Sequence, residues 1–190
     1  MEQPTKTSFF FKNLAKGLIW LGVIVALFVF SKHHADKELI IRFEPLFSRT
    51  FLILTIFSFS ELLIGIIPPE VFMIWSLRSG EIHTYIFWIV ILTVISYLAG
   101  LTAYMFGRYL HNTRLYNYLH NRYLMKSEKL LHEYGLYLIL VAALTPFPFS
   151  GVAMLVGAVH YPVKRYIYWS LSRFAKFALS AWIIWEANML

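Results

Sequence analysis

Two glutamates stand in an apolar stretch where few carboxylates are expected. Glu61 and Glu70 lie on either side of a Pro-Pro pair, in a run that is otherwise almost wholly hydrophobic. Removal of a carboxylate from water favours its protonated form, so either glutamate could take up and release a proton. A nearby arginine favours the charged form, and Arg108 and Arg173 are the candidates. An anionic group that captured the arginine would leave the glutamate to accept a proton.

A structural role is the alternative for both glutamates. A break in a helix exposes backbone N–H groups, and a carboxylate beside the break can accept their hydrogen bonds. Two hydroxyl residues beside a second proline-rich break, Thr145 and Ser150, could bind a polar headgroup, but capping of a half-helix is the favoured role for them. The helix N-termini after the breaks direct partial positive charge inward, which favours a phosphate there.

No catalytic or metal-binding constellation accompanies these groups. The chain has no cysteine, which removes disulfides and thiol chemistry, and its seven histidines show no metal-ligand spacing. It contains no nucleophile elbow, phosphate-binding loop or zinc motif. We therefore expect no enzyme activity, no cofactor and no metal ion.

The composition predicts a polytopic membrane protein. Of 190 residues, 59% are hydrophobic and 14% are charged, whereas soluble domains have about 45–50% and about 25%. The net charge of +7 comes from basic residues that lie between apolar spans. It therefore predicts topology and contacts with lipid headgroups rather than nucleic-acid binding.

The hydropathy pattern divides the chain into membrane segments of two kinds. Segments 50–77 and 134–159 are interrupted in the middle by proline or glycine. As one helix the first would be about 42 Å long, too long for a hydrocarbon core of about 30 Å, so a re-entrant hairpin fits better. The uninterrupted segments 9–30, 84–107 and 163–185 are predicted to be membrane helices.

The interruptions predict where irregular backbone lies inside the membrane. Lipid cannot satisfy free N–H and C=O groups, so such backbone must be shielded by protein or line a watery cavity. Breaks at matching places in two halves of a chain are the best sequence indication of a transport site. The residues that we assign to the breaks are Gly65, Pro68, Pro69, Pro146, Pro148, Gly151 and Gly157.

Small and charged residues mark helix faces that contact protein. Gly100 and Gly107 could let another helix approach closely, although glycine is also simply common in membrane helices. Arg173 and Lys176 lie inside a predicted membrane helix, where charged side chains usually face a protein interior or a cavity. Both pairs predict contact surfaces within the fold.

Two units follow an N-terminal region. We divide the chain into a helix with an interfacial connector, 1–49, and a membrane domain, 50–187, made of a hairpin plus helix (50–107), a polar segment (108–133) and a second hairpin plus helix (134–187). The polar segment is either an amphipathic helix on an anionic leaflet or a solvated helix. If both hairpins return to the side they entered, more basic residues fall on the N-terminal side, which predicts a cytoplasmic N-terminus and an inverted repeat.

These motifs together resemble the DedA/VTT (SNARE-associated Golgi protein) family. The resemblance covers roughly residues 45–187, and the order and spacing of its motifs are more specific than any motif alone. The matching residues are Phe59-Ser60-Glu61, Pro68-Pro69-Glu70, Gly100, Gly107-Arg108, and Pro146 to Gly157 before Tyr161-Pro162-Val163-Lys164-Arg165-Tyr166.

The resemblance implies lipid movement across a bilayer, in some members coupled to protons. It makes Glu61 and Glu70 the required acidic residues of the first hairpin, and Arg108 the required arginine of a Gly-Arg motif. Bacterial members also carry arginines around the second proline turn, whereas the corresponding stretch of this chain has no arginine or lysine. Arg173 on the last helix is the candidate substitute.

The sequence thus predicts an all-α integral membrane protein of the bacterial inner membrane, with two re-entrant hairpins packed against transmembrane and amphipathic helices. Its predicted function is to move a phosphorylated lipid, a polyprenyl phosphate or a phospholipid, between leaflets. The alternatives are a proton-coupled transporter of a small solute and a non-transporting scaffold for envelope assembly. The predicted partners are anionic or phosphorylated lipids, and self-association into a homo-oligomer is left open. The candidate substrate and proton site is Glu61, Glu70, Arg108, Thr145, Ser150 and Arg173.

Overall fold

The computed structural model describes most of the predicted membrane domain. The described residues are 15, 19–20, 22–27, 49–63, 65, 67–110, 128–145 and 148–189. Most of the predicted first helix, most of the connector and most of the polar segment 108–133 lie outside this set, as does Pro146.

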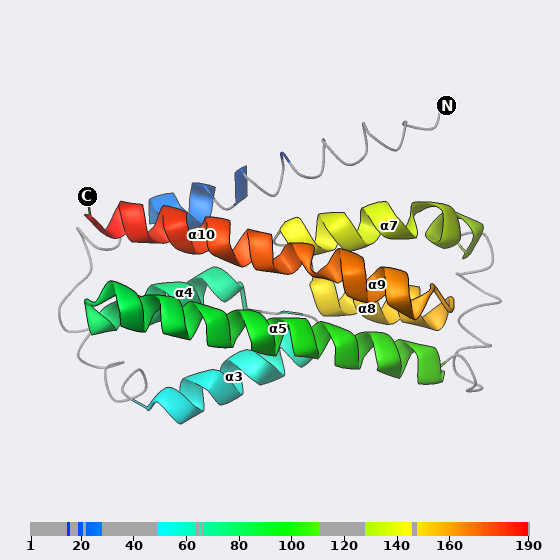
Figure 1. Ribbon diagram of the computed structural model, residues 1–190, viewed down its shortest axis with the longest axis horizontal. Helices are drawn as coiled ribbons and strands as arrows, with labels where there is room; N and C mark the ends of the chain where they lie inside the picture. Colours follow the sequence, from blue (N-terminus) through cyan, green and yellow to red (C-terminus); the bar gives the residue numbers. More distant parts are fainter. Residues whose placement is uncertain are drawn as a thin grey trace.

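Regular structure in the described part of the chain is entirely helical (Figure 1). This confirms the all-α class. The elements are α3 (Thr50–Leu62), α4 (Pro69–Ser76), a short 3-10 helix η1 (Leu77–Ser79), α5 (Ile82–Leu110), α7 (Glu128–Leu144), α8 (Phe149–Ala158), α9 (Val163–Ser170) and α10 (Ser172–Met189).

Two helix–break–helix pairs enter the molecule from opposite ends (Figure 1). Helix α3 runs from one end to the middle, and α4 returns toward the same end. Helices α7 and α8 make the matching excursion from the other end. The long helix α5 extends along the whole molecule, while α9 and α10 run back in the opposite direction. Residues of α3 and α8 are in contact, so the two breaks face each other near the middle.

Proline and glycine shape the two breaks. Gly65 adopts the left-handed region with a φ of 68°, which glycine reaches without steric cost. Its N–H donates to the carbonyl oxygen of Ser60 at 2.7 Å, which closes the turn after α3. Pro68 and Pro69 then begin α4, and Pro148 begins α8, where a missing N–H costs little because the first N–H groups of a helix have no partner within it.

Gly151 and Gly157 lie inside α8 rather than at a break, which corrects the sequence assignment. Gly157 serves helix packing instead. A Cβ at this position would overlap the backbone carbonyl oxygen of Tyr104 on α5, and one at Gly107 would overlap the carbonyl oxygen of Met154 on α8. Helices α5 and α8 therefore approach at backbone distance, so the small-residue face has a packing role.

The helix bounds differ from the sequence expectation in three places. The predicted helix 163–185 consists of α9 and α10, separated at Leu171. Around Leu171 the N–H groups bond to carbonyl oxygens three residues earlier, and the hydroxyl of Ser170 also binds a carbonyl of its own helix, a contact that competes with regular helical bonding. Helix α5 continues through Arg108, and α7 begins at Glu128, inside the predicted polar segment.

The outer surface of the described helices is rich in large apolar side chains, unlike that of a soluble protein. One helix in the described part, Ile82–Leu110, is long and apolar enough to cross a membrane. Its outer face exposes large apolar side chains, while charged and hydroxyl groups are buried between helices. Apolar surface faces outward in a membrane protein because lipid is its solvent. The exposed apolar residues of α5 include Ile82, Ile86, Phe87, Val90, Val94, Leu98, Met105 and Phe106.

Substitution of Gly157 by leucine is predicted to destabilise the protein. The added side chain would push α8 away from α5, and overpacking of this kind typically costs about 1–3 kcal/mol. Thermal unfolding of the detergent-solubilised protein measures the effect. Leu155→Ala is the control on the same helix, because Leu155 is exposed. A Gly157→Leu variant as stable as the control would contradict the close helix contact.

Candidate functional site

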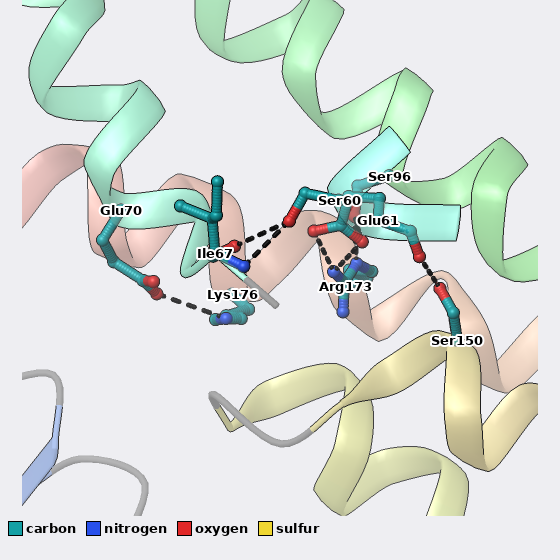
Figure 2. Close-up of polar contacts among 8 residues, drawn as sticks. All are labelled: Ser60, Glu61, Ile67, Glu70, Ser96, Ser150, Arg173 and Lys176. Atoms are coloured by element: carbon teal, nitrogen blue, oxygen red, sulfur yellow. Dashed lines mark hydrogen bonds and ion pairs between the residues drawn. The ribbon is translucent and has the colours of Figure 1, made fainter. Parts of the chain in front are cut away.

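Four charged side chains are buried together where α3, α4 and α10 meet (Figure 2). Glu61 ends α3, Glu70 begins α4, and Arg173 and Lys176 lie on α10. Their exposed fractions are 1%, 0%, 3% and 6%. Two negative and two positive charges balance, which is the condition under which such groups can be buried at all.

Glu61 and Arg173 form a closed arrangement with Ser96 on α5. One guanidinium nitrogen of Arg173, Nη2, lies 2.9 Å from Oε1 and 2.7 Å from Oε2 of Glu61. The Ser96 hydroxyl donates to Oε2 of Glu61 at 2.8 Å, and it accepts a hydrogen bond from Nε of Arg173. Each of the three side chains thus binds both of the others, and together they join α3, α5 and α10 (Figure 2).

The second hairpin contributes an aromatic ring to the same arginine. The guanidinium carbon of Arg173 lies 4.3 Å from the ring centroid of Phe149, the first residue of α8. A cation is attracted to the face of an aromatic ring, and more strongly when water is excluded. Arg173 is therefore held between the carboxylate of the first hairpin and the ring of the second.

Glu70 and Lys176 form the second ion pair. Nζ of Lys176 lies 3.2 Å from Oε1 of Glu70. Glu70 is in the first turn of α4, where the helix dipole favours a negative charge. Neither carboxylate oxygen of Glu70 has a hydrogen bond of good geometry to the part of the chain that the structure describes. Glu70 therefore depends on one lysine contact, whereas Glu61 has several partners.

Hydroxyl groups connect the breaks without capping the helix that follows each break. The Ser150 hydroxyl donates to the backbone carbonyl oxygen of Glu61, so it satisfies the end of α3 rather than the start of its own helix. The Ser60 hydroxyl accepts the N–H of Ile67 at 2.8 Å. The Thr145 hydroxyl donates to Val141 within α7 at 2.6 Å. The hydroxyls of Ser150 and Thr145 therefore satisfy carbonyl groups of α3 and α7 rather than N–H groups at the start of α8.

Arg108 lies apart from the two ion pairs. It is exposed in the last turn of α5, where its Nη1 donates to the hydroxyl of Tyr104 at 3.2 Å. That hydroxyl donates in turn to the carbonyl oxygen of Tyr161, next to the start of α9. Among the described residues, no ion pair joins Arg108 to either glutamate. Of the candidate site residues, the structure brings together Glu61, Glu70, Arg173 and Ser150.

Three contributors were missing from the candidate site predicted from the sequence. Lys176 follows Arg173 by three residues and so lies on the same face of α10. Two acidic and two basic residues in neighbouring apolar helices are a signal that could have identified it. Ser96 and Phe149 carry no such signal, because serine and phenylalanine are common in membrane helices and only the packing brings them to Arg173.

Replacement of Arg173 by methionine is predicted to destabilise the protein strongly. It would leave Glu61 buried without a cation, and the loss of one partner of a buried pair costs about 3–5 kcal/mol. The double variant Glu61→Gln with Arg173→Met should lose less than the sum of the two single losses, since neither charge is then left alone. Thermal unfolding in detergent measures all three. Strictly additive losses would contradict a direct interaction.

Ser150→Ala is predicted to loosen the contact between the two hairpins. It leaves the carbonyl of Glu61 without its hydroxyl donor, which costs about 1–3 kcal/mol for a buried group. Thr145→Val is the matched control, because the carbonyl of Val141 also accepts the N–H of Thr145 at 2.9 Å and stays satisfied. Unfolding temperatures that fall equally in both variants would argue against a hairpin contact through Ser150.

Comparison with known families identifies the domain. A model of the VTT domain matches residues 67–185, a range that contains Glu70, Lys176, Arg173 and Arg108 and begins shortly after Glu61. No curated protein and no solved structure gave a significant match. The VTT domain is the domain of the DedA and SNARE-associated family, which is membrane-associated and not known as a family of enzymes. Because the match spans more than half of its residues, this chain belongs to the VTT domain family of membrane proteins.

Proposed function

We propose that this protein moves a lipid with a phosphorylated headgroup between the two leaflets of its membrane. The observation that carries the proposal is the charge-balanced cluster of Glu61, Glu70, Arg173 and Lys176, buried where the two breaks meet. Arginine and lysine are the side chains that bind phosphate. Charged residues inside a membrane domain mark substrate or proton pathways by default. Transport families place their substrate sites at such breaks.

In this proposal α3–α4 and α7–α8 are re-entrant hairpins that enter from opposite faces as an inverted repeat. Helix α3 has 13 residues and α8 has 10, so at about 1.5 Å per residue neither spans a hydrocarbon core of about 30 Å. Helix α5, with 29 residues, is long enough. The opposite directions of the two pairs in Figure 1 support the arrangement.

An apolar groove beside the ion pairs is suited to the lipid tail. It lies between α5 and α10, has a volume of about 480 Å³, and is lined by residues such as Ile89, Phe174 and Trp182. The hydroxyls that line it, Tyr85 and Thr93, bind backbone carbonyls and are not free. Its apolar lining suits a hydrocarbon chain rather than a polar headgroup.

We further propose that the protein lies in a bacterial inner membrane with its N-terminus in the cytoplasm. Exposed basic residues support this orientation. Arg108 ends α5, and Lys164 and Arg165 begin α9, at the same end of the molecule. Basic residues near membrane helices favour the cytoplasmic side.

Reconstitution into liposomes tests the proposed function. The purified protein should accelerate the movement of fluorescent phosphatidylglycerol between leaflets, measured by dithionite quenching. Arg173→Lys and Lys176→Met should slow it by about tenfold or more, which corresponds to about 1.4 kcal/mol of barrier. Lys164→Met is the control, because Lys164 is exposed at the start of α9.

The outcomes separate the alternatives. Equal rates in wild type and in both α10 variants would contradict a role for the buried cations. Solute uptake that follows a pH gradient without lipid movement would indicate the small-solute transporter. Absence of both activities in folded protein would indicate the scaffold.

A further inference from the structure

The two buried ion pairs differ in how firmly their members are held. Glu61 has two contacts to Arg173 and one to Ser96, and Arg173 also stacks on Phe149. Glu70, fully buried, is paired with Lys176 at one oxygen, and both of its carboxylate oxygens lack a hydrogen bond of good geometry within the described residues. The members of the first pair are held by several contacts each, whereas the carboxylate of the second pair has fewer contacts than it can accept.

The chemistry of the two cations differs in the same direction. A guanidinium remains charged in proteins and binds through several fixed donors. A lysine ammonium is a compact charge on a flexible stem, and it can move between partners at little cost. Lys176 can therefore exchange a carboxylate for another anion, whereas Arg173 would have to abandon three different partners at once.

The surroundings of Glu70 offer few groups that compete with Lys176 for its carboxylate. Pro68 and Pro69 have no N–H, so the start of α4 offers fewer donors that could hold the carboxylate. The Ser180 hydroxyl, one turn beyond Lys176 on α10, is buried and has no hydrogen-bond partner in the described part of the chain. A polar ligand at this place would meet a cation and an available hydroxyl.

The other groups that face the pair are already engaged. The charged ones are Glu61 on α3 and Arg173 on α10, which bind each other. On α5, Ser96 belongs to the same arrangement, Thr93 donates to Ile89, and Tyr85 donates to the carbonyl of Ala181. Exchange at Lys176 therefore breaks none of the hydrogen bonds that join Glu61, Arg173 and Ser96.

We propose that Glu70–Lys176 is the exchangeable pair of this protein, at which an anionic lipid phosphate replaces Glu70 on Lys176 while Glu70 takes up one proton from water. Glu61, Arg173 and Ser96 remain a fixed connection between helices. The proposal rests on the proposed lipid function and assigns its site.

The charge balance of the cluster couples proton uptake by Glu70 to anion binding at Lys176. Before exchange, two carboxylates offset two cations. After exchange, protonated Glu70 is neutral and the singly charged phosphate takes its place, so the cluster is again neutral. A net charge left inside the membrane would be costly, so proton and anion bind together and leave together. A headgroup of zero net charge should bind without proton uptake.

Proton uptake on lipid binding tests the proposal. Protein in weakly buffered detergent solution is mixed with dihexanoyl phosphatidylglycerol, and a pH indicator measures the protons taken up. Wild type should take up about one proton per bound lipid, since one carboxylate accepts one proton. Dihexanoyl phosphatidylcholine, which has the same chains and a headgroup without net charge, should cause none.

The variants locate the proton. Glu70→Gln should abolish the uptake, whereas Glu186→Gln, the same change at an exposed position of α10, should retain it. Lys176→Met removes the cation that the phosphate would bind, so it should weaken phosphatidylglycerol binding by about tenfold and abolish the proton uptake, because Glu70 then has no cation to give up. This variant at Lys176 still tests the proposal if the Glu70→Gln protein does not fold.

Two results would overturn the proposal: uptake that persists in folded Glu70→Gln, or unchanged lipid affinity in folded Lys176→Met. The liposome assay on the same proteins separates the two levels of the proposal. Lipid movement by wild type together with uptake that ignores Glu70 leaves the function standing and removes this assignment. Proton uptake that depends on Glu70 but is not accompanied by lipid movement would support the assignment of Glu70 and contradict the proposed function.

Discussion

The burial of two carboxylates is the constraint on which the rest of this structure depends. Glu61 and Glu70 stand at the two sides of one break, and neither can be buried in its charged form without a cation. Both cations come from one face of α10, at Arg173 and Lys176. The last helix must therefore lie against the tip of the first hairpin, and the chain between them must return to that place.

Helix α8 completes the enclosure of the charged cluster. Phe149 stacks on Arg173, and the hydroxyl of Ser150 reaches the backbone at the end of α3. Close packing of α8 on α5 makes these contacts possible, because glycine at 107 and 157 lets the two backbones meet. Gly107 and Gly157 do not contact the charges, but they set the position of α8, the helix that covers the charged cluster. The result is a charged cluster enclosed by apolar helix packing.

In the proposed transport site, the two ion pairs divide stability and exchange between them. The connection through Glu61, Arg173 and Ser96 spans three helices and leaves no donor of that serine unused. The Glu70–Lys176 contact involves two helices and leaves carboxylate oxygens unsatisfied. A transport site needs one part that keeps its geometry and another that changes partners. Their placement three residues apart on α10 joins the two parts in one rigid element.

The sequence by itself determined the helical class, the membrane character, the family and the break at Gly65 to Pro69, because composition and backbone restrictions are local properties. It also singled out Glu61, Glu70 and Arg173 as charges in apolar surroundings. The tertiary structure alone decided which charges meet. It pairs Glu61 with Arg173 across 112 positions, leaves Arg108 at the far end of α5, and adds Ser96 and Phe149. The reason is physical. A charged residue in an apolar segment predicts that some partner must offset its charge, but only the packing of the helices determines which partner lies within reach.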